Sequence, residues 1–307
     1  MNKTNINTKV NFIGVSFKNP VVTASGTFGF GREYNEFYDI SKLGGICVKG
    51  LTLNPRIGNK PPRIAETPMG MLNSVGLQNP GVDAFIKEEL PFLRKFDTVV
   101  IANISGNTAD EYAQMTEKLS HAKIDIIEVN VSCPNVKQGG MAFGTSVEGI
   151  TEVTKAVMGK TTVPVMVKLS PNVTDIVSMA KAAEDAGADA VSLINTLLAM
   201  RIDTITKKPI LNNNVGGLSG GAVFPVALRM VWQVASALKI PVLGMGGISS
   251  GNDAIEMFLA GASLIAAGTV CFDDPYAPVK IINEIEDYMI NNSISDINEL
   301  TGKVQLN

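Results

Sequence analysis

The chain has 307 residues, of which 45% are hydrophobic and only 18% charged, so it can bury a large core. The formal net charge of −3 and the lack of a basic tract argue against nucleic acid as a partner. The low charge leaves little polar surface, which favours burial in an oligomer. The N-terminus has no apolar core of a signal peptide, and no eighteen apolar residues follow one another. We therefore expect a soluble, cytoplasmic protein without a membrane partner.

Eight short, mostly apolar runs alternate with stretches of helical periodicity. The expected strands are Val21–Ala24, Gly45–Lys49, Thr98–Ile104, Asp125–Val131, Pro164–Leu169, Ala190–Asn195, Pro241–Gly246 and Ser263–Ala267. The clearest helical stretches are Thr108–Leu119, Thr174–Ala186, Ala222–Leu238 and Asn252–Ala260. Continuously apolar strands are typical of parallel strands covered on both faces. The pattern predicts a (β/α)8 TIM barrel that forms one domain over residues 1–307, with an open, doubly wound sheet as the alternative.

Three segments depart from a minimal barrel. Residues Val10–Phe17 alternate and predict a hairpin ahead of strand 1, over the barrel floor. Insertions follow strand 2, at Leu51–Gly81, and strand 6, at Leu197–Gly221. Both are too long to be simple connections and leave from carboxyl ends of strands, where such barrels place their active sites. We therefore expect both insertions to contribute to function.

The cysteines and the single histidine limit the kinds of catalytic and metal site that this chain can form. Cys47, Cys133 and Cys271 lie far apart and fit neither a disulfide framework nor the ligand spacing of a metal site. Three cysteines are also too few for an iron–sulfur cluster held by this chain alone. His121 ends an expected helix, where a cation favours the helix dipole, so we interpret it as structural. An acid or base for catalysis must come from another residue type.

The segment Asn130-Val-Ser-Cys-Pro-Asn135 places Cys133 where strand 4 opens into a loop. A thiol between two side-chain amides suits proton abstraction from a small polar substrate. The glycines of the following loop, residues 136–144, would let it close over the site. A buried structural cysteine is the alternative, but the end of a barrel strand favours catalysis.

Every other strand also ends in glycine or a polar residue. These endings are Ala24-Ser-Gly-Thr27, Lys49-Gly50, Asn103, Lys168, Asn195-Thr196, Gly246-Gly-Ile-Ser249 and Gly268-Thr269. Strands 7 and 8 are where barrels commonly bind phosphate through backbone N–H groups, so Gly246-Gly247 and Gly268-Thr269 predict a phosphate-bearing ligand. The alternative is that these glycines only form turns.

Alternation places Lys49 and Lys168 on the side of Cys47 and Met166, which we interpret as the barrel interior. Lys168 could pair with Glu128 on the neighbouring strand and could stabilise negative charge on an electron-rich ring, and the two roles are compatible. For Lys49 we favour contact with a ligand. The amides of these strand ends and of Asn73-Ser-Val-Gly-Leu77 would suit a flat, amide-like substrate, although Asn and Gly also form turns.

Together these residues resemble the class 1 dihydroorotate dehydrogenases, flavin enzymes of pyrimidine synthesis. The matching elements run in order along nearly the whole chain, and Asn130-Val-Ser-Cys-Pro-Asn135 is the most specific. Class 2 enzymes carry serine as the base and an N-terminal membrane-associating helix, and this sequence shows neither. Within class 1, Gly26-Thr-Phe-Gly29 and Gly217-Leu-Ser-Gly-Gly221 look like the NAD-linked branch, class 1B.

The resemblance implies one FMN per chain across the barrel mouth and dihydroorotate stacked on it. Catalytic roles would fall to Cys133 as the base, with Lys49 and Lys168. FMN would be held by Ser25, Lys49, Gly50, Asn103, Asn130, Lys168, Ile194, Gly220, Gly246, Gly247, Gly268 and Thr269. The substrate would be held by Lys49, Asn73, Ser74, Val75, Gly76, Leu77, Asn130, Asn195 and Thr196. No metal site is implied.

Class 1B membership would also imply a second subunit. That subunit carries FAD and a two-iron two-sulfur cluster and passes electrons to NAD, and two copies would flank a homodimer of this chain. A fumarate-linked class 1A enzyme, reoxidised without such a subunit, is the alternative. A related FMN dihydropyrimidine or dihydrouridine oxidoreductase is a further alternative. A tRNA dihydrouridine synthase should carry a basic RNA-binding face, which the pI of about 5.4 argues against. A non-redox sugar-phosphate barrel and a non-catalytic scaffold subunit fit less well, because they leave the strand-end residues without a shared role.

Overall fold

The computed structural model describes residues 6–132 and 143–307. Eight parallel strands form a closed barrel in the order β10-β15-β16-β3-β4-β7-β8-β9. These strands are β3 (Val21–Thr23), β4 (Gly45–Cys47), β7 (Val99–Ile104), β8 (Ile126–Asn130), β9 (Val165–Lys168), β10 (Ala190–Leu193), β15 (Val242–Met245) and β16 (Leu264–Ala267). All eight predicted strands are confirmed, with ends trimmed by one or two residues, and the open sheet is excluded.

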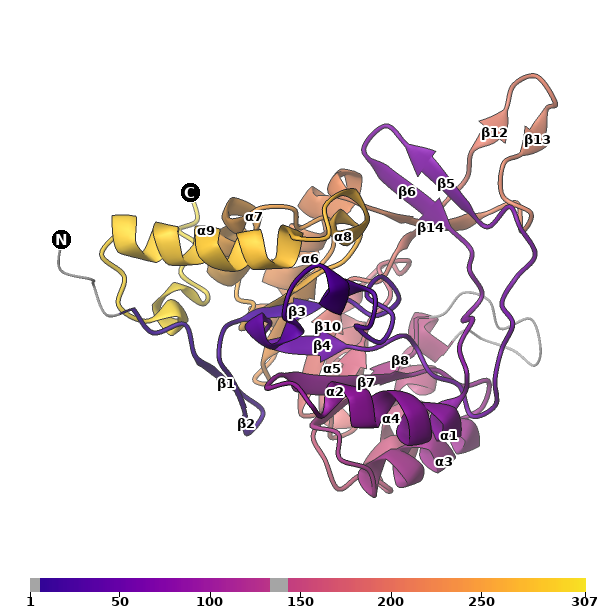
Figure 1. The fold of residues 1–307 in the computed structure, drawn as a ribbon, viewed down its shortest axis with the longest axis horizontal. Coiled ribbons are helices and arrows are strands. Elements are labelled where there is room, and N and C mark those ends of the chain that lie inside the picture. The colour runs from indigo at the N-terminus through magenta and orange to yellow at the C-terminus, as the bar shows by residue number, and fades with distance from the viewer. Residues whose placement is uncertain (1–5, 133–142) are drawn as a thin grey trace.

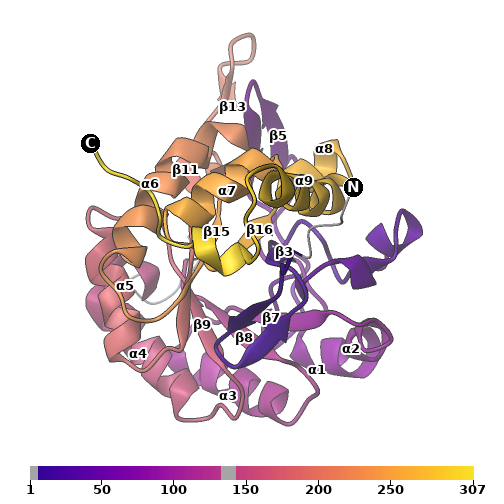
Figure 2. The same cartoon turned by 90° about the vertical axis from the view of Figure 1, so that its left-hand side faces the viewer.

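Helices surround the barrel on its outer side (Figure 2). They are α1 (Val82–Ala84), α2 (Leu90–Leu93), α3 (Ala109–Ser120), α4 (Val147–Met158), α5 (Ile176–Asp185), α6 (Phe224–Ala235), α7 (Gly251–Leu259), α8 (Val270–Asp273) and α9 (Ala277–Asn291). Thr108 and Asp175 cap two of them by accepting backbone N–H bonds with their side chains. His121 is the C-terminal cap of α3, in line with the structural role predicted for it.

The predicted N-terminal hairpin is confirmed as β1 (Val10–Phe12) paired with β2 (Val15–Phe17). The rings of Phe12 and Phe17 are at most 1% exposed and meet edge to face at 6.2 Å. A Cβ added to Gly45, at the start of β4, would lie 3.0 Å from the Phe17 ring. The hairpin therefore closes the amino-terminal end of the barrel, where it lies across β7 and β8 in Figure 2.

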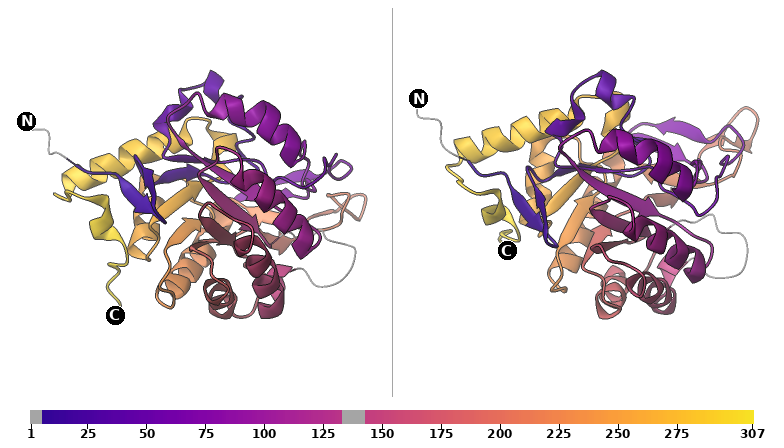
Figure 3. Two further views of the ribbon diagram at one scale, coloured as in Figure 1. Left: turned by 90° about the horizontal axis from the view of Figure 1, so that it is seen from below. Right: turned by 60° about the horizontal axis from the view of Figure 1, so that its bottom comes forward.

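Both insertions meet above the opposite, carboxyl end of the barrel. Strands β5 (Ile64–Thr67) and β6 (Gly70–Asn73) come from the first insertion, and β11 (Leu197–Ala199) and β14 (Gly216–Ser219) from the second. They form one four-stranded antiparallel sheet in the order β11-β14-β6-β5, which we call the roof sheet. A hairpin of β12 (Ile202–Asp203) and β13 (Lys208–Pro209) extends beyond it (Figures 1 and 3).

Candidate active site

A cavity of about 1060 Å³ lies between the carboxyl ends of the barrel strands and the roof sheet. Nineteen of the site residues predicted from the sequence line it: Ser25, Lys49, Gly50, Asn73, Ser74, Val75, Gly76, Leu77, Asn103, Asn130, Lys168, Ile194, Asn195, Thr196, Gly220, Gly246, Gly247, Gly268 and Thr269. The remaining one, Cys133, lies outside the described residues, as do residues 136–142 of the loop that follows it. The structure thus brings distant segments to one place without placing the thiol.

Glycines form the end of the cavity beyond β15 and β16. Gly246 and Gly247 have φ angles of +125° and +76°, which favour glycine. A Cβ on Gly247 would lie 2.8 Å from the carbonyl oxygen of Gly220, so the backbones approach too closely for any side chain. The next helix, α7, begins at Gly251 behind a capping box formed by Ser250 and Asp253. This end offers backbone rather than side chains to a ligand, as a phosphate cradle does.

A buried group of polar side chains lies beneath the floor of the cavity, which it reaches through Asn103. Asn103 Nδ2 donates a 2.5 Å hydrogen bond to Oε2 of Glu128, and Ser192 donates at 2.7 Å to Oε1. The thiol of Cys47 donates to Oε2 at 3.2 Å. Burial, followed by the charge of Glu128, raises the pKa of the Cys47 thiol well above its ordinary value. Cys47 is therefore a protonated donor beneath the cavity and not a nucleophile.

The two predicted lysines both reach the cavity. Lys168 is only 4% exposed, and its Nζ lies 3.4 Å from Oγ of Ser25. Nζ of Lys49 lies 3.7 Å from the position that a Cβ would take on Gly26. The ion pair of Lys168 with Glu128 that we considered from alternation is wrong. The strand register places Lys168 opposite Asn130 and Glu128 opposite Met166, so the lysine lies nearer the barrel mouth than the carboxylate.

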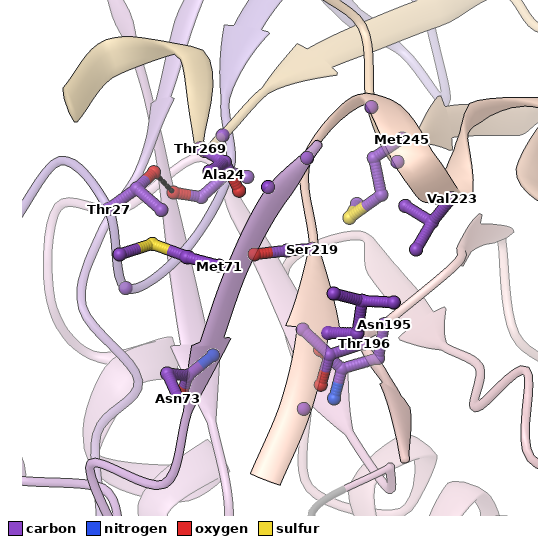
Figure 4. A pocket seen from close by; sticks show the side chains of 18 of the residues that line it. Ala24, Thr27, Met71, Asn73, Asn195, Thr196, Ser219, Val223, Met245 and Thr269 are labelled. Carbon is purple, nitrogen blue, oxygen red and sulfur yellow. Dashed lines mark hydrogen bonds between the residues drawn. The ribbon is translucent and has the colours of Figure 1, made fainter. Parts of the chain in front are cut away.

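Hydrogen bonds join the loop after β10 to the segment that leads to Cys133. Asn195 Nδ2 donates to Oγ of Ser132 at 2.6 Å, and that hydroxyl donates to Oδ1 of Asn130 at 2.7 Å. Asn195 and Thr196 lie across the cavity from Asn73 on β6 (Figure 4). Amide groups therefore face the cavity from the barrel and from the roof sheet, as a small molecule with several N–H and C=O groups requires.

The remainder of the predicted loop 73–77 follows the edge of the cavity. Asn59 holds it from behind, with its side chain donating to the Ser74 carbonyl at 2.8 Å and its backbone N–H donating to Val75 at 2.9 Å. Asn79 donates to the carbonyl of Leu77 at 2.7 Å. These bonds fix the loop with its inner edge toward the cavity.

Sequence reasoning missed the contribution of the roof sheet itself. From this sheet and its β5–β6 turn, Met69, Met71 and Ser219 also line the cavity. Val223, Met245 and Phe272 line it from other elements, and Figure 4 labels Met71, Ser219, Val223 and Met245. One local signal was present, since Thr67-Pro-Met-Gly70 separates two short runs and is typical of a hairpin turn. The pairing of β6 with β14 joins segments more than 140 residues apart and carries no such signal.

Two negative findings apply to residues 6–132 and 143–307. None of the helices there is long and apolar enough to cross a membrane. Over the same ranges, no three His, Cys, Asp or Glu side chains are grouped so that they could hold a metal ion. The polar groups of the predicted site in this part of the chain are amides, hydroxyls, lysines and backbone.

The closed barrel with a polar cavity at the carboxyl ends of its strands defines a (β/α)8-barrel enzyme. The family model for dihydroorotate dehydrogenase matches residues 7–289, and the chain belongs to that family. Catalytic subunits of dihydroorotate dehydrogenase B (NAD(+)) are similar along almost the whole chain. Those of Thermoanaerobacter pseudethanolicus and Alkaliphilus oremlandii are 57% and 58% identical over 98% of this chain and all of their own. That of Geobacter metallireducens is 55% identical over 97% of this chain and 98% of its own.

Proposed function

We propose that this chain oxidises dihydroorotate to orotate in pyrimidine synthesis, as the FMN-binding catalytic subunit of an NAD-linked enzyme. The observation that carries the proposal is the convergence of nineteen predicted strand-end and loop residues on one cavity. Membership of the dihydroorotate dehydrogenase family and the names of the relatives support the same reaction. Residues 1–307 form a single catalytic domain in this proposal.

The cavity suits FMN by two features of the described residues. Oδ1 of Asn103 is buried without a hydrogen-bond partner and belongs to a residue that lines the cavity, so a ligand N–H or O–H would satisfy it. At the far end, Gly246 and Gly247 line the cavity without side chains of their own and leave their backbone N–H groups uncovered on that side, which suits a phosphate. Ser25, Gly50, Asn130, Ile194, Gly220, Gly268 and Thr269 would complete the FMN site along with Lys49 and Lys168.

The residues around the substrate would have three roles: proton removal, charge stabilisation and orientation of the substrate. Cys133 would take the proton from C5 of dihydroorotate, and bound FMN would accept the hydride from C6. Lys168 keeps a cation at the buried floor of the cavity, where it stabilises negative charge that develops on the ligand above it. Lys49, Asn73, Asn195 and Thr196, with the backbone of residues 75–77, would orient the flat substrate through its amide and carboxylate groups.

Electrons must then leave the site, and this chain has no dinucleotide-binding fingerprint or set of four cluster-forming cysteines. A partner subunit that carries FAD and a two-iron two-sulfur cluster would pass them to NAD. The relatives are named catalytic subunits, which supports the existence of such a partner. A homodimer of this chain flanked by two partners, in the cytoplasm, completes the proposal.

An anaerobic absorption spectrum of the purified chain, before and after dihydroorotate, tests this function. We expect a flavin band near 450 nm that dihydroorotate bleaches in the wild type and leaves unchanged in Cys133→Ala. Fumarate added to the bleached protein should not restore the band, whereas NAD with the partner subunit should. Recovery with fumarate alone would identify a class 1A enzyme, and a protein that cannot bind FMN would exclude the flavin reaction.

A further inference from the structure

Glu128 is a buried carboxylate to which the proposed mechanism gives no role. It lies in the middle of β8, points into the barrel and is only 1% exposed. No Lys or Arg forms an ion pair with it among the residues that the structure describes. A buried charge without a paired cation is costly, so its presence two residues before Asn130 calls for a physical reason.

The three groups around Glu128 form a set of donors. Ser192 reaches Oε1 at 2.7 Å, whereas Asn103 and Cys47 reach Oε2 at 2.5 and 3.2 Å. An amide NH2 only donates, and the raised pKa of Cys47 keeps its thiol protonated. Oε2 of Glu128 is therefore an acceptor in both of its contacts, with Asn103 and with Cys47.

One of these contacts determines which face Asn103 presents to the cavity. Because Nδ2 of Asn103 is held by Glu128, Oδ1 is the atom left over. Oδ1 is buried without a partner in the described part of the chain, and Asn103 lines the cavity. It lies 2.9 Å from the place that a Cβ on Gly50 would take, so a side chain at that position would crowd this oxygen. Glu128 therefore makes Asn103 an acceptor for the ligand.

The charge of Glu128 is also placed to act on the cavity. Lys168 pairs in register with Asn130 and Glu128 with Met166, so the carboxylate lies one step below the lysine inside the barrel. Both charges act on the thiol of Cys47, where Glu128 raises the pKa and Lys168 lowers it. The cation at the cavity floor is thus opposed by an anion beneath it, in a region where water screens neither charge.

We propose that Glu128 is a positioning residue for the cofactor, which keeps the oxygen of Asn103 turned toward the bound flavin and holds down the flavin's reduction potential with its buried negative charge. The inference rests on the proposed function, because it requires FMN in this cavity. It assigns a role to a residue that does not line the cavity. A purely structural Glu128 would support folding and cofactor affinity and would leave the potential unchanged.

The midpoint potential of bound FMN in Glu128→Gln tests this role, measured against a reference dye with a chemical reductant so that dihydroorotate is not needed. Glutamine has the same shape without the charge, so reduction of the flavin should become easier. We expect the ratio of reduced to oxidised flavin at a fixed potential to rise at least tenfold, which is about 30 mV for a two-electron couple. FMN affinity should change less than the potential, because the carbonyl oxygen of the glutamine can still accept the hydrogen bond from Asn103 Nδ2 while its NH2 group donates to the Ser192 hydroxyl.

Ser192→Ala is the matched control, since it removes one donor to Glu128 and keeps the charge. Its potential should equal that of the wild type. A Glu128→Gln variant that binds FMN at the wild-type potential would overturn the inference while leaving the proposed function intact. A wild-type chain that cannot bind FMN would overturn both.

Glu128→Asp decides the question if the glutamine variant does not fold. It keeps the charge and shortens the reach to Asn103, so we expect weaker FMN binding at an unchanged potential. Either of two results for Glu128→Asp would overturn the inference. One is a midpoint potential raised enough to change the ratio of reduced to oxidised flavin tenfold. The other is an FMN affinity equal to that of the wild type.

Discussion

Asn195 donates a 2.6 Å hydrogen bond from Nδ2 to Oγ of Ser132, the residue directly before Cys133. The same hydroxyl donates to Asn130 at 2.7 Å, so one serine joins two amides from different strand ends. Asn130 and Asn195 both line the cavity, whereas Ser132 does not. The serine therefore positions two groups proposed to hold the substrate.

We predict that Ser132→Ala lowers kcat/KM for dihydroorotate by at least about fivefold, because a hydrogen bond of this kind contributes about 1 kcal/mol and each 1.4 kcal/mol is a tenfold change in rate. The flavin band should remain. Steady-state kinetics on the FMN-loaded enzyme measure the effect. Ser170→Ala is the control, because Ser170 is also a buried serine just after a strand end but is hydrogen-bonded to Asn172 and not to Asn130 or Asn195. Wild-type kinetics in Ser132→Ala would contradict the prediction.

Gly217 on β14 lines the cavity next to Thr196, on the side where we place the substrate. A Cβ at this position would lie 2.0 Å from Oγ1 of Thr196, and its φ angle is not in the left-handed region. Because the added Cβ would also lie 2.5 Å from Cβ of Thr196, Gly217→Ala should displace Thr196 together with its backbone, while residue 217 itself keeps an allowed conformation. We expect KM for dihydroorotate to rise about tenfold or more while FMN stays bound, as kinetics and the flavin spectrum would show. Loss of FMN in this variant would show that Thr196 is not separate from the cofactor site.

Gly247 lies at the opposite end of the cavity, where we place the phosphate of the cofactor. Its φ is +76°, and a Cβ would lie 2.8 Å from the Gly220 carbonyl and 2.8 Å from the Phe224 Cβ. Gly247→Ala should close the proposed phosphate cradle, so we expect the purified variant to lose its yellow colour. Gly302→Ala is the control, because Gly302 has a similar positive φ of +71° and nothing lies within 4 Å of the added Cβ. That control should lose about 1–2 kcal/mol of unfolding free energy in urea and keep FMN.

The barrel could be predicted from the sequence because each strand is a continuous apolar run that ends in polar residues. In β8, for example, five buried residues, Ile126–Asn130, lead to the cysteine segment. The closed order of the strands then places every carboxyl end at one mouth, so the site residues converge without any knowledge of their side-chain geometry.

Two features could not be predicted, and both depend on register. Alternation shows that Glu128 and Lys168 share the barrel interior, but only the pairing of β8 with β9 shows that they occupy different heights. The roof sheet depends on Leu72 of β6 pairing with Leu218 of β14, a contact between two separate insertions. Neither insertion contains enough alternation to specify a partner so distant in the sequence.

Alkylation should separate the three thiols. Burial raises the pKa of Cys271 to about 12, and burial with the charge of Glu128 raises that of Cys47 well above its ordinary range. Raised pKa values leave almost no thiolate at pH 8, about one part in ten thousand for Cys271, and the thiolate is the reactive form. We expect iodoacetamide to add one group per native chain, at Cys133, as intact-mass spectrometry would show. The Cys133→Ala variant should add none, and a group on Cys47 would contradict the burial argument.

The pH dependence of turnover tests the proposed base. A cysteine with the ordinary pKa of about 8.5 is about 3% thiolate at pH 7 and about 75% at pH 9, so activity should rise about 25-fold over that range. The activity rises with pH only if the deprotonated form of the cysteine is the active one, as expected of a base.

The variant Cys133→Ser should be slower by orders of magnitude, and its rate should still increase at pH 10, because a serine hydroxyl does not titrate there. Cys271→Ala, which removes a thiol that stays protonated in this range, should retain the wild-type profile. Stopped-flow bleaching of the flavin by dihydroorotate isolates this step from reoxidation. A rate independent of pH between 7 and 9 would show that Cys133 is not the group that titrates.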